Sequence, residues 1–397
     1  MTTALDVRAL EAQRLLQNYR RFPVVFTRGE GIRLFDEDGR PYLDFLSGIG
    51  VASLGHAHPV LTRALTDQAA TLLHTSNLYY HPLQAELAQR LTTLSGLDRA
   101  FFCNSGTEAI EACLKFARRY WYTQGQPRSK FVALWHGFHG RTMGALSVTW
   151  DAHYRTPFEP LVPTATTLDS DDPEALLAAV DADTAAIVVE PVRGEGGVRP
   201  VPAPLASAIA DACRRSGALL IADEVQSGSW RTGTFLHAPS IGLEPDLVAL
   251  AKALGAGVPV GAVLLRERVA STVAAGDHGT TYGGNLLACR AALTFLDVVD
   301  TLHDRMRAAS ARLFERLRAL QAARPDIVTD VRGAGLIAGF EVTVDALAVV
   351  NAALERGLIV NRTSNTVLRL LPPYIVTPAD VDDAVDILDQ AIGAVVS

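Results

Sequence analysis

Apolar runs of strand length alternate with helical patterns through the middle of the chain. The runs expected to form strands are Ala100–Cys103, Lys130–Trp135, Ala185–Glu190, Ala218–Asp223, Leu247–Leu250 and Val260–Leu265. The stretches expected to form helices between them are Glu108–Tyr122, Pro173–Val180 and Ala203–Ser216. This alternation predicts an α/β fold, in which helices cover both faces of a mostly parallel central sheet.

The two ends of the chain carry different patterns. Residues 1–20 read as an amphipathic helix, and two short alternating runs around Asp38-Gly39 predict a hairpin within Gly29–Phe45. After about residue 293 the pattern changes to a long charged helix at Leu302–Ala323, short strands and a final helix at Pro378–Val396.

These changes of pattern predict two domains. We expect a large domain over residues 61–292, which holds the alternating strands and helices. We expect a smaller α+β domain assembled from both chain ends, residues 1–60 and 293–397.

Composition narrows the class of protein. The 397-residue chain has a formal net charge of −7 with both signs well mixed, which gives no preference for nucleic acid or an anionic membrane. Because it has no membrane-length apolar run and no secretory pattern at its start, we expect a cytoplasmic protein. The four cysteines show no CxxC spacing, which favours free buried thiols over a disulfide framework.

The strongest candidates for catalytic residues lie at the ends of two predicted strands. One apolar strand runs into Asp223, Glu224 and Gln226, and the next delivers Lys252, one of only three lysines. Ligands of open parallel sheets bind at the carboxyl ends of strands, so both segments point to one crevice, about one strand–helix–strand unit apart. A desolvated lysine there attacks carbonyls, and a nearby aspartate pairs with a protonated pyridine nitrogen. A buried Lys–Asp ion pair without chemistry is the alternative interpretation.

Two glycine-containing loops are candidate anion sites. Ser105 and Glu108 fit a capping box, which leaves Gly106 and Thr107 at a helix N-terminus where the dipole favours an anion. The loop HGTTYGGN, residues 278–285, suits a second phosphate contact. Taken alone, a helix cap without a ligand is the better explanation of the first loop, and a glycine-rich turn explains the second loop equally well.

A third loop, WHGFHGRTMG, combines an aromatic residue with an arginine. Phe138 suits stacking on a planar ring, and Arg141 suits a bidentate contact to a carboxylate. His136 and His139 lack neighbours that would complete a metal site at usual spacing, so no metal is expected.

Together these segments resemble the class III (ornithine/acetylornithine-type) aminotransferases. The resemblance runs from about Gly29 to Pro373, and its motifs are YLDFLSGIGVASLGHAHP, NSGTEAIEACLKFAR, FHGRTMGALS, VEPVRGEGGV, DEVQSG, RTGTF, EPDLVALAKALGAGVPVGAV, HGTTYGGN and LRLLPP. It implies the type I fold of transferases that depend on pyridoxal 5′-phosphate (PLP). It also implies an amino donor, 2-oxoglutarate as acceptor, and a homodimer or a dimer of dimers.

The resemblance further implies roles for matching residues. Lys252 would be the Schiff-base lysine and proton shuttle, and Asp223 would keep the pyridine nitrogen protonated. The other implied cofactor contacts are Gly106, Thr107, Phe138, Glu224, Val225, Gln226 and, across the subunit interface, Thr281. The implied substrate contacts are Arg141, Glu195, Thr280 and Arg369. Glu195 would cover Arg369 until glutamate or 2-oxoglutarate replaces it.

Two positions bear on the amino donor. Ile49 stands where ornithine aminotransferases have tyrosine, which resembles the acetylornithine and also the GABA aminotransferases. The first resemblance implies N2-acetyl-L-ornithine as donor, in arginine biosynthesis. Trp230 replaces a usual small residue, and its bulky indole is expected to reshape a nearby wall of the site. It leaves open ornithine, GABA, diaminobutyrate, succinyl-diaminopimelate or carrier-linked aminoadipate semialdehyde. A non-catalytic binding protein is a third hypothesis, against which the intact Lys252 and Asp223 argue.

Overall fold

The structure is a computed structural model that describes residues 4–396. Its largest element is a seven-stranded sheet. Across the sheet the strands are β4 (Arg99–Cys103), β12 (Gly261–Leu265), β11 (Leu247–Leu250), β10 (Leu219–Asp223), β7 (Thr184–Val189), β5 (Lys130–Ala133) and β6 (Ala165–Thr167). Every neighbouring pair is parallel except the two that involve β12. The prediction of a mostly parallel α/β sheet is confirmed.

The antiparallel strand follows from a short connection. Residues 251–260 join β11 to β12 and contain only the 3-10 helix η3 (Lys252–Gly255), whereas a parallel neighbour needs a longer crossover. The connection from β10 to β11 also lacks the expected α-helix. Its helical element is the short η2 (Ala238–Ile241), so this part of the strand–helix–strand prediction was wrong.

Helices cover both faces of this sheet because its strand residues alternate between two apolar cores. Leu219 and Ile221 of β10 pack in a core with α5, whereas Leu220 and Ala222 pack in a core with α9 and α11. The helices of this part are α3 (Pro59–Thr71), α4 (Pro82–Ser95), α5 (Gly106–Thr123), α6 (Met143–Ser147), α7 (Ala152–Arg155), α8 (Pro173–Ala179), α9 (Ala203–Ser216), α10 (Glu267–Ala270) and α11 (Leu286–Val299), with the 3-10 helix η1 (Thr156–Phe158).

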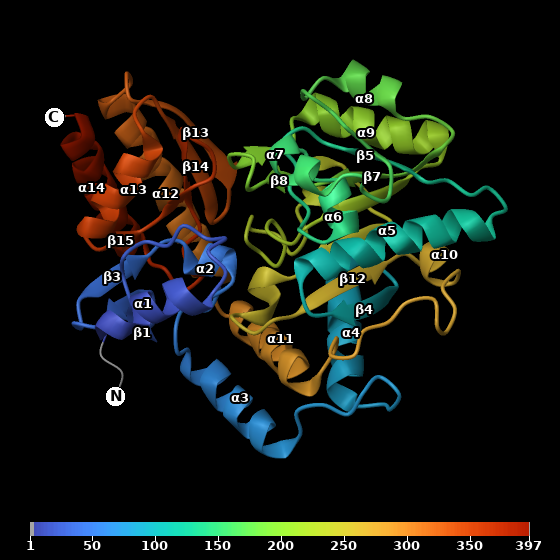
Figure 1. Cartoon of the computed structure of the whole chain (residues 1–397), viewed down its shortest axis with the longest axis horizontal. Coiled ribbons are helices and arrows are strands. Elements are labelled where there is room, and N and C mark those ends of the chain that lie inside the picture. The colour runs from blue at the N-terminus through green and yellow to red at the C-terminus, as the bar shows by residue number, and fades with distance from the viewer. Residues whose placement is uncertain (1–3, 397) are drawn as a thin grey trace.

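The chain ends form two further four-stranded sheets (Figure 1). One has the order β1 (Phe26–Glu30), β2 (Arg33–Asp36), β3 (Pro41–Asp44), β15 (Leu358–Ile359). The other has the order β13 (Val328–Ala334), β14 (Ile337–Val342), β17 (Val367–Leu370), β16 (Asn361–Arg362). Their helices are α1 (Ala4–Arg14), the turn α2 (Ser47–Gly50), α12 (His303–Ala323), α13 (Ala346–Glu355) and α14 (Pro378–Val396). A small two-stranded sheet, β8 (Val192–Arg193) with β9 (Arg199–Pro200), lies between β7 and α9 in the sequence.

Strand pairing joins the N-terminal and C-terminal parts of the chain. The predicted hairpin is confirmed as β2 and β3, and β3 continues parallel to β15, which places Leu43 beside Leu358. The N-terminal helix ends at Arg14 instead of residue 20, and its first three predicted residues lie outside the described part. We propose that residues 1–60 with 293–397 form one domain and residues 61–292 the other, with the second boundary inside α11.

The helices and the cysteines bear on two further predictions from the sequence. None of the described helices is both long and apolar enough to cross a membrane. The four cysteines are free, and Cys103, Cys113 and Cys289 are buried, while Cys213 is partly exposed.

Candidate active site

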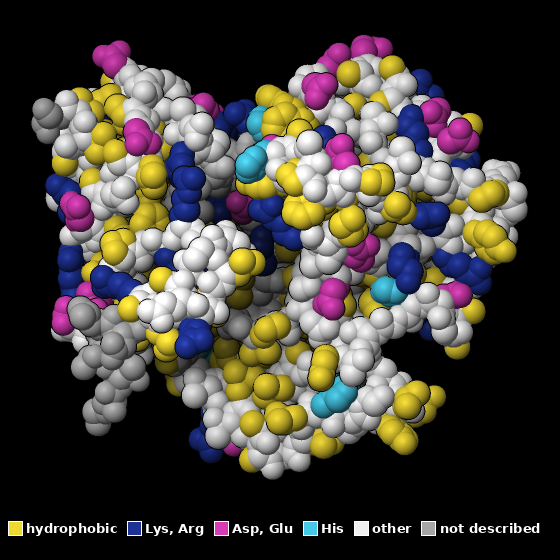
Figure 2. All heavy atoms as spheres, viewed as in Figure 1, with side chains coloured by type: hydrophobic (Ala, Val, Ile, Leu, Met, Phe, Trp, Pro, Cys, Tyr) yellow, Lys and Arg dark blue, Asp and Glu magenta, His cyan; other side chains and the backbone are white. Residues whose placement is uncertain are grey.

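Two adjoining cavities lie where the strands of the large sheet end, and the molecule is hollowed on the face seen in Figure 2. The first, which we call the inner cavity, has a volume of about 440 Å³ and is lined by Asp223, Gln226 and Lys252 among others. The second, the outer cavity, has a volume of about 680 Å³. Residues that line both are Val51, Phe138, Arg141 and Lys252. The sequence prediction that Lys252 and Asp223 face one crevice is confirmed.

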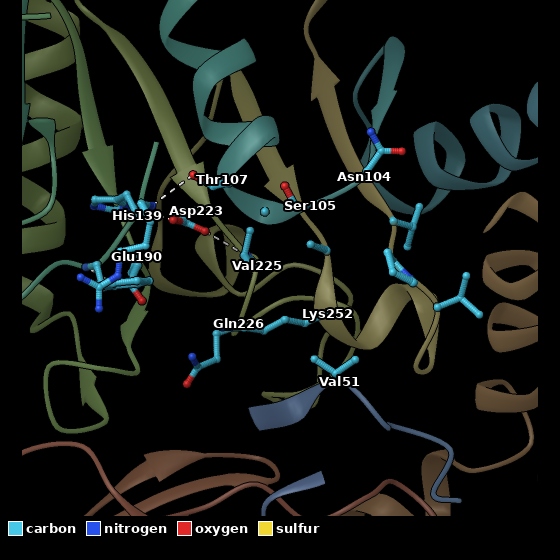
Figure 3. A pocket seen from close by; sticks show the side chains of 18 of the residues that line it. Val51, Asn104, Ser105, Thr107, His139, Glu190, Asp223, Val225, Gln226 and Lys252 are labelled. Carbon is cyan, nitrogen blue, oxygen red and sulfur yellow. Dashed lines mark hydrogen bonds and ion pairs between the residues drawn. The ribbon is translucent and has the colours of Figure 1, made fainter. Parts of the chain in front are cut away.

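Lys252 follows β11 at a sharp turn. Its φ of 44° lies in the left-handed region, which a lysine seldom adopts, so the turn is strained to present this side chain (Figure 3). Burial lowers the pKa of the Lys252 ammonium, and the charge of Arg369 lowers it further, while Glu195, Asp223 and Glu190 oppose the shift. A lowered pKa increases the fraction of free amine, which is the nucleophilic form.

Asp223, the last residue of β10, has a buried partner that the sequence did not reveal. Its Oδ2 lies 2.7 Å from Nδ1 of His139, and its Oδ1 accepts the N–H of Val225 at 3.1 Å. Burial opposes a charge on His139, but the bond and charge of Asp223 outweigh it and raise the imidazole pKa. His139 therefore orients the carboxylate that faces the inner cavity. No group of three or more metal-ligating side chains occurs among residues 4–396.

Glu190 is a second residue that sequence analysis missed. It follows β7 and lines the inner cavity, where its carboxylate accepts the N–H of Phe138 at 2.7 Å and of Gly194 at 3.3 Å. Burial raises its pKa to about 7, against the lowering effect of His139. Glu190 therefore ties the aromatic loop to the loop that carries Glu195.

The first turn of α5, where the sequence predicts an anion site, borders the inner cavity. Ser105 caps the helix, because its Oγ accepts the N–H of Glu108 at 3.3 Å. The Glu108 carboxylate accepts the N–H of Asn104 at 2.7 Å, so the capping box reaches one residue further back than predicted. The N–H groups of Gly106 and Thr107 are left without partners within the helix and line the inner cavity.

Glu195 and Arg369 are paired as predicted. Glu195 Oε1 accepts Nη1–H of Arg369 at 2.6 Å, and Gln226 joins them by accepting from Nη1 at 3.0 Å and donating to Glu195 at 3.4 Å. Arg369 is completely buried, and its Nη2 has no hydrogen-bond partner among the described residues. Burial acts to raise the pKa of Glu195, but Arg369 and Lys252 outweigh it and the net shift is downward.

The outer cavity is lined mainly by loops. Its wall at Ile49 belongs to a left-handed turn, because Ser47, Gly48, Ile49 and Gly50 have φ values of 47°, 63°, 66° and 77°. Such a conformation is costly for a β-branched residue, so surrounding bonds must impose it. Asp44 Oδ1 accepts the N–H groups of Leu46 and Ser47, and Ser47 Oγ donates to the carbonyl of Leu371 at 2.6 Å.

Arg141 and aromatic side chains complete the outer cavity. The guanidinium of Arg141 lies 3.8 Å from the ring centre of Tyr154 and 5.3 Å from that of Phe138. His136 packs against the rings of both Trp135 and Trp150, and burial followed by the charges of nearby arginines lowers its pKa to about 4. At neutral pH the cavity thus offers Arg141 as a cation beside uncharged rings.

Neither cavity is lined by Arg369, Glu224, Thr280, Thr281 or Trp230, all of which the sequence singled out. The Glu224 carboxylate accepts bonds from Ser227 and from the N–H of Ala238. Thr280 Oγ1 accepts from Asn104 at 3.2 Å, and Thr281 is exposed. Trp230 packs against Phe235, Phe295 and His303 on the wall of a separate cavity. The expectation that Trp230 reshapes the substrate site was therefore wrong.

Comparisons with known proteins show which family the chain belongs to. The family model for "Aminotransferase class-III" matches residues 15–392. An acetylornithine aminotransferase of Aquifex aeolicus is 44% identical over 95% of this chain and 99% of its own length. A solved ornithine aminotransferase from Toxoplasma gondii, with partial occupancy of PLP at its active site, is 35% identical with a TM-score of 0.93, covering 99% of this chain and 95% of that one. An N-acetylornithine aminotransferase structure from Stenotrophomonas maltophilia is 32% identical with a TM-score of 0.84, covering 98% and 99%.

The chain belongs to the class III aminotransferases. It is a transaminase of the type I fold, and its family implies PLP as cofactor, a small-molecule amino donor and a keto-acid acceptor.

Proposed function

We propose that this enzyme transfers the distal amino group of N2-acetyl-L-ornithine to 2-oxoglutarate, giving N-acetylglutamate 5-semialdehyde and glutamate, in cytoplasmic arginine biosynthesis. The observation that carries the proposal is near-full-length similarity to acetylornithine aminotransferases, at 44% identity for the Aquifex aeolicus protein. Ile49 in the outer cavity supports it, since an apolar side chain there offers no partner to a free α-ammonium group.

The inner cavity fits PLP by its chemistry. An anion cradle at Gly106 and Thr107, a carboxylate at Asp223 and a free amine at Lys252 match a phosphate, a pyridine nitrogen and an aldehyde. When bound, this cofactor supplies the aldehyde that accepts the amino group and a ring that withdraws electrons from the reacting carbon.

We assign the following chemical roles to residues of the inner cavity. Lys252 Nζ would hold the cofactor and, once free of it, would move a proton from the substrate carbon that carries the reacting amino group. Asp223, oriented by His139, keeps the proton on the pyridine nitrogen. Phe138, Val225 and Gln226 line the inner cavity, where Phe138 would stack on the ring, Val225 would pack beside it and Gln226 would bind the phenolic oxygen. Glu224 was also predicted as a cofactor contact, but its carboxylate is engaged elsewhere, so we leave it out.

Arg141 and Arg369 are assigned to the carboxylates of the two substrates. Arg141 in the outer cavity would bind the α-carboxylate of the acetylated donor. Glu195 covers Arg369 at this stage, which compensates a buried charge. When glutamate or 2-oxoglutarate binds, Glu195 would turn away and Arg369 would take the α-carboxylate, with Nη2 ready as a donor.

The active site is proposed to form in a homodimer or a dimer of dimers. Thr281 is exposed, beside Tyr282, which is also exposed. We assign Thr281 to the phosphate in the neighbouring subunit's site, and Thr280 to the substrate side. A monomer in light scattering that keeps full activity would contradict the proposed dimer and the role of Thr281.

A donor panel tests the proposed function. Steady-state kcat/KM is measured with N-acetylornithine, ornithine, GABA, diaminobutyrate and succinyl-diaminopimelate, with 2-oxoglutarate as acceptor. We expect N-acetylornithine to have the highest value. A higher value for ornithine or GABA would refute the proposed donor while leaving the transaminase class intact.

A further inference from the structure

Asn361 contacts Arg369 on the side opposite to Glu195. Its Oδ1 accepts the Nε–H of Arg369 at 3.2 Å, whereas Glu195 accepts from Nη1. Asn361 lines neither cavity, so it acts through Arg369. We propose that Asn361 is a positioning residue that determines acceptor specificity: it holds the Arg369 guanidinium in place while Glu195 and an α-carboxylate exchange. This inference rests on the proposed role of Arg369.

Counting the donors of Arg369 shows why such an anchor is needed. A guanidinium has five N–H donors, and this one is completely buried. Glu195 is its one acidic partner among the described residues. When Glu195 turns away, the remaining partners are Asn361 at Nε and Gln226 at Nη1. Both are amides, so together they fix the direction of the guanidinium, while the buried Nη2 has no partner among the described residues and is left to bind a carboxylate that takes the place of Glu195.

The charge of the anchor matters as much as its position. A neutral amide fixes Arg369 without cancelling its positive charge, so the charge stays available to a carboxylate. A carboxylate at the same place would neutralise Arg369 permanently and compete with the substrate. Gln226 cannot replace the anchor, since we assign its amide to the cofactor as well.

The backbone holds Asn361 in register. β16 and β17 are antiparallel, and Asn361 lies directly opposite Arg369. Residues opposite each other on one face of such a pair have Cβ atoms roughly 4.5–5.5 Å apart. On its other side β17 pairs with β14, where Gly339 lies opposite Arg369. The Asn361–Arg369 contact is thus built into two paired strands.

The test separates the two half-reactions of the holoenzyme. The Asn361→Asp variant keeps the shape of the side chain and adds a charge. We expect its KM for glutamate and for 2-oxoglutarate to rise about tenfold or more, because a charged partner competes for Arg369. The half-reaction with N-acetylornithine, which proceeds with Arg369 covered, should change less than about threefold. Each is followed by the absorbance of the bound cofactor with a single substrate.

Two further variants test whether the effect comes from the added charge at position 361. Asn361→Ala removes the anchor without adding a charge, and a smaller rise in KM for glutamate is expected, again with the donor half-reaction spared. Asn351→Asp makes the same charge change on the exposed side of α13, next to β16, and both half-reactions should match the wild type. Thermal melting checks that each variant is folded, and Asn361→Ala decides the question if Asn361→Asp does not fold.

Equal losses in both half-reactions, or no change in either, would overturn the role of Asn361. A wild-type enzyme that fails with N-acetylornithine would instead refute the proposed donor. The comparison would then be repeated with the best donor of the panel, so the two failures are distinguishable.

Discussion

The inner and outer cavities share four lining residues, yet they are built in different ways. The inner cavity is formed by strand ends and the first turn of a long helix, and its polar groups hold one another: Asp223 with His139, and Glu190 with two backbone N–H groups. The outer cavity is lined largely by loops, including a left-handed turn and residues 363–365. Asp223 and Lys252, which we assign to chemistry, therefore lie at strand ends, whereas Arg141 and Glu195, which we assign to the substrates, lie on loops. Arg369, on strand β17, is the exception among the substrate residues.

This difference predicts that substitutions in the two cavities have different effects on the kinetics. Changes in the inner cavity should lower the rate with every donor, because all donors share one chemistry there. Changes in the outer cavity should alter the ratio between donors and leave the shared chemistry in place. The Glu195–Arg369 pair lies where the two meet, since Gln226 of the inner cavity contacts both of its members.

The largest effect is expected at Asp223. The Asp223→Ala variant should lose about 10²–10³-fold in kcat, because one preorganised electrostatic contact to the reacting system is removed. The loss should be similar for all donors of the panel. A loss confined to one donor would contradict the division between the two cavities.

Substitution of Ile49 tests the prediction for the outer cavity. The Ile49→Tyr variant places a hydroxyl in the outer cavity, within reach of a free α-amino group. We expect kcat/KM for ornithine relative to N-acetylornithine to rise about tenfold or more. Trp230→Gly is the matched control, because Trp230 lines a different cavity and its replacement should leave the donor ratio unchanged.

A smaller, pH-dependent effect is expected at His139. Its pKa is raised in the folded protein, so the stability it contributes is fully present below the unfolded value of 6.5 and is lost as pH rises through the folded pKa. His139→Asn should cost about 3–5 kcal/mol of unfolding free energy in the cofactor-free protein at pH 6, because a buried pair is broken. The difference from wild type should narrow as pH rises. Denaturant titrations at several pH values measure it, and a difference independent of pH would refute the charged pair.

The sequence predicted the inner cavity better than the outer one. Asp223, Gln226 and Lys252 follow strands, and strand ends are visible in a hydrophobic pattern. The partners His139 and Asn361 were not predicted, because each pairs with a residue that the chain brings close only through folding. The left-handed turn at Ile49 was missed for a related reason, since bonds from Asp44 and to Leu371 impose it. Trp230 was misjudged because its place in a loop says nothing of which cavity it faces.

The central claim is that Lys252 carries the cofactor, and its site of attachment can be mapped directly. The chain has three lysines, Lys115, Lys130 and Lys252, so reducing the purified holoenzyme with borohydride and sequencing its peptides by mass spectrometry gives a clear answer. We predict that the peptide containing Lys252 alone carries the reduced cofactor, and that Lys252→Ala yields no labelled peptide and no turnover. Label on Lys115 or Lys130, or full activity in the Lys252→Ala variant, would contradict the account.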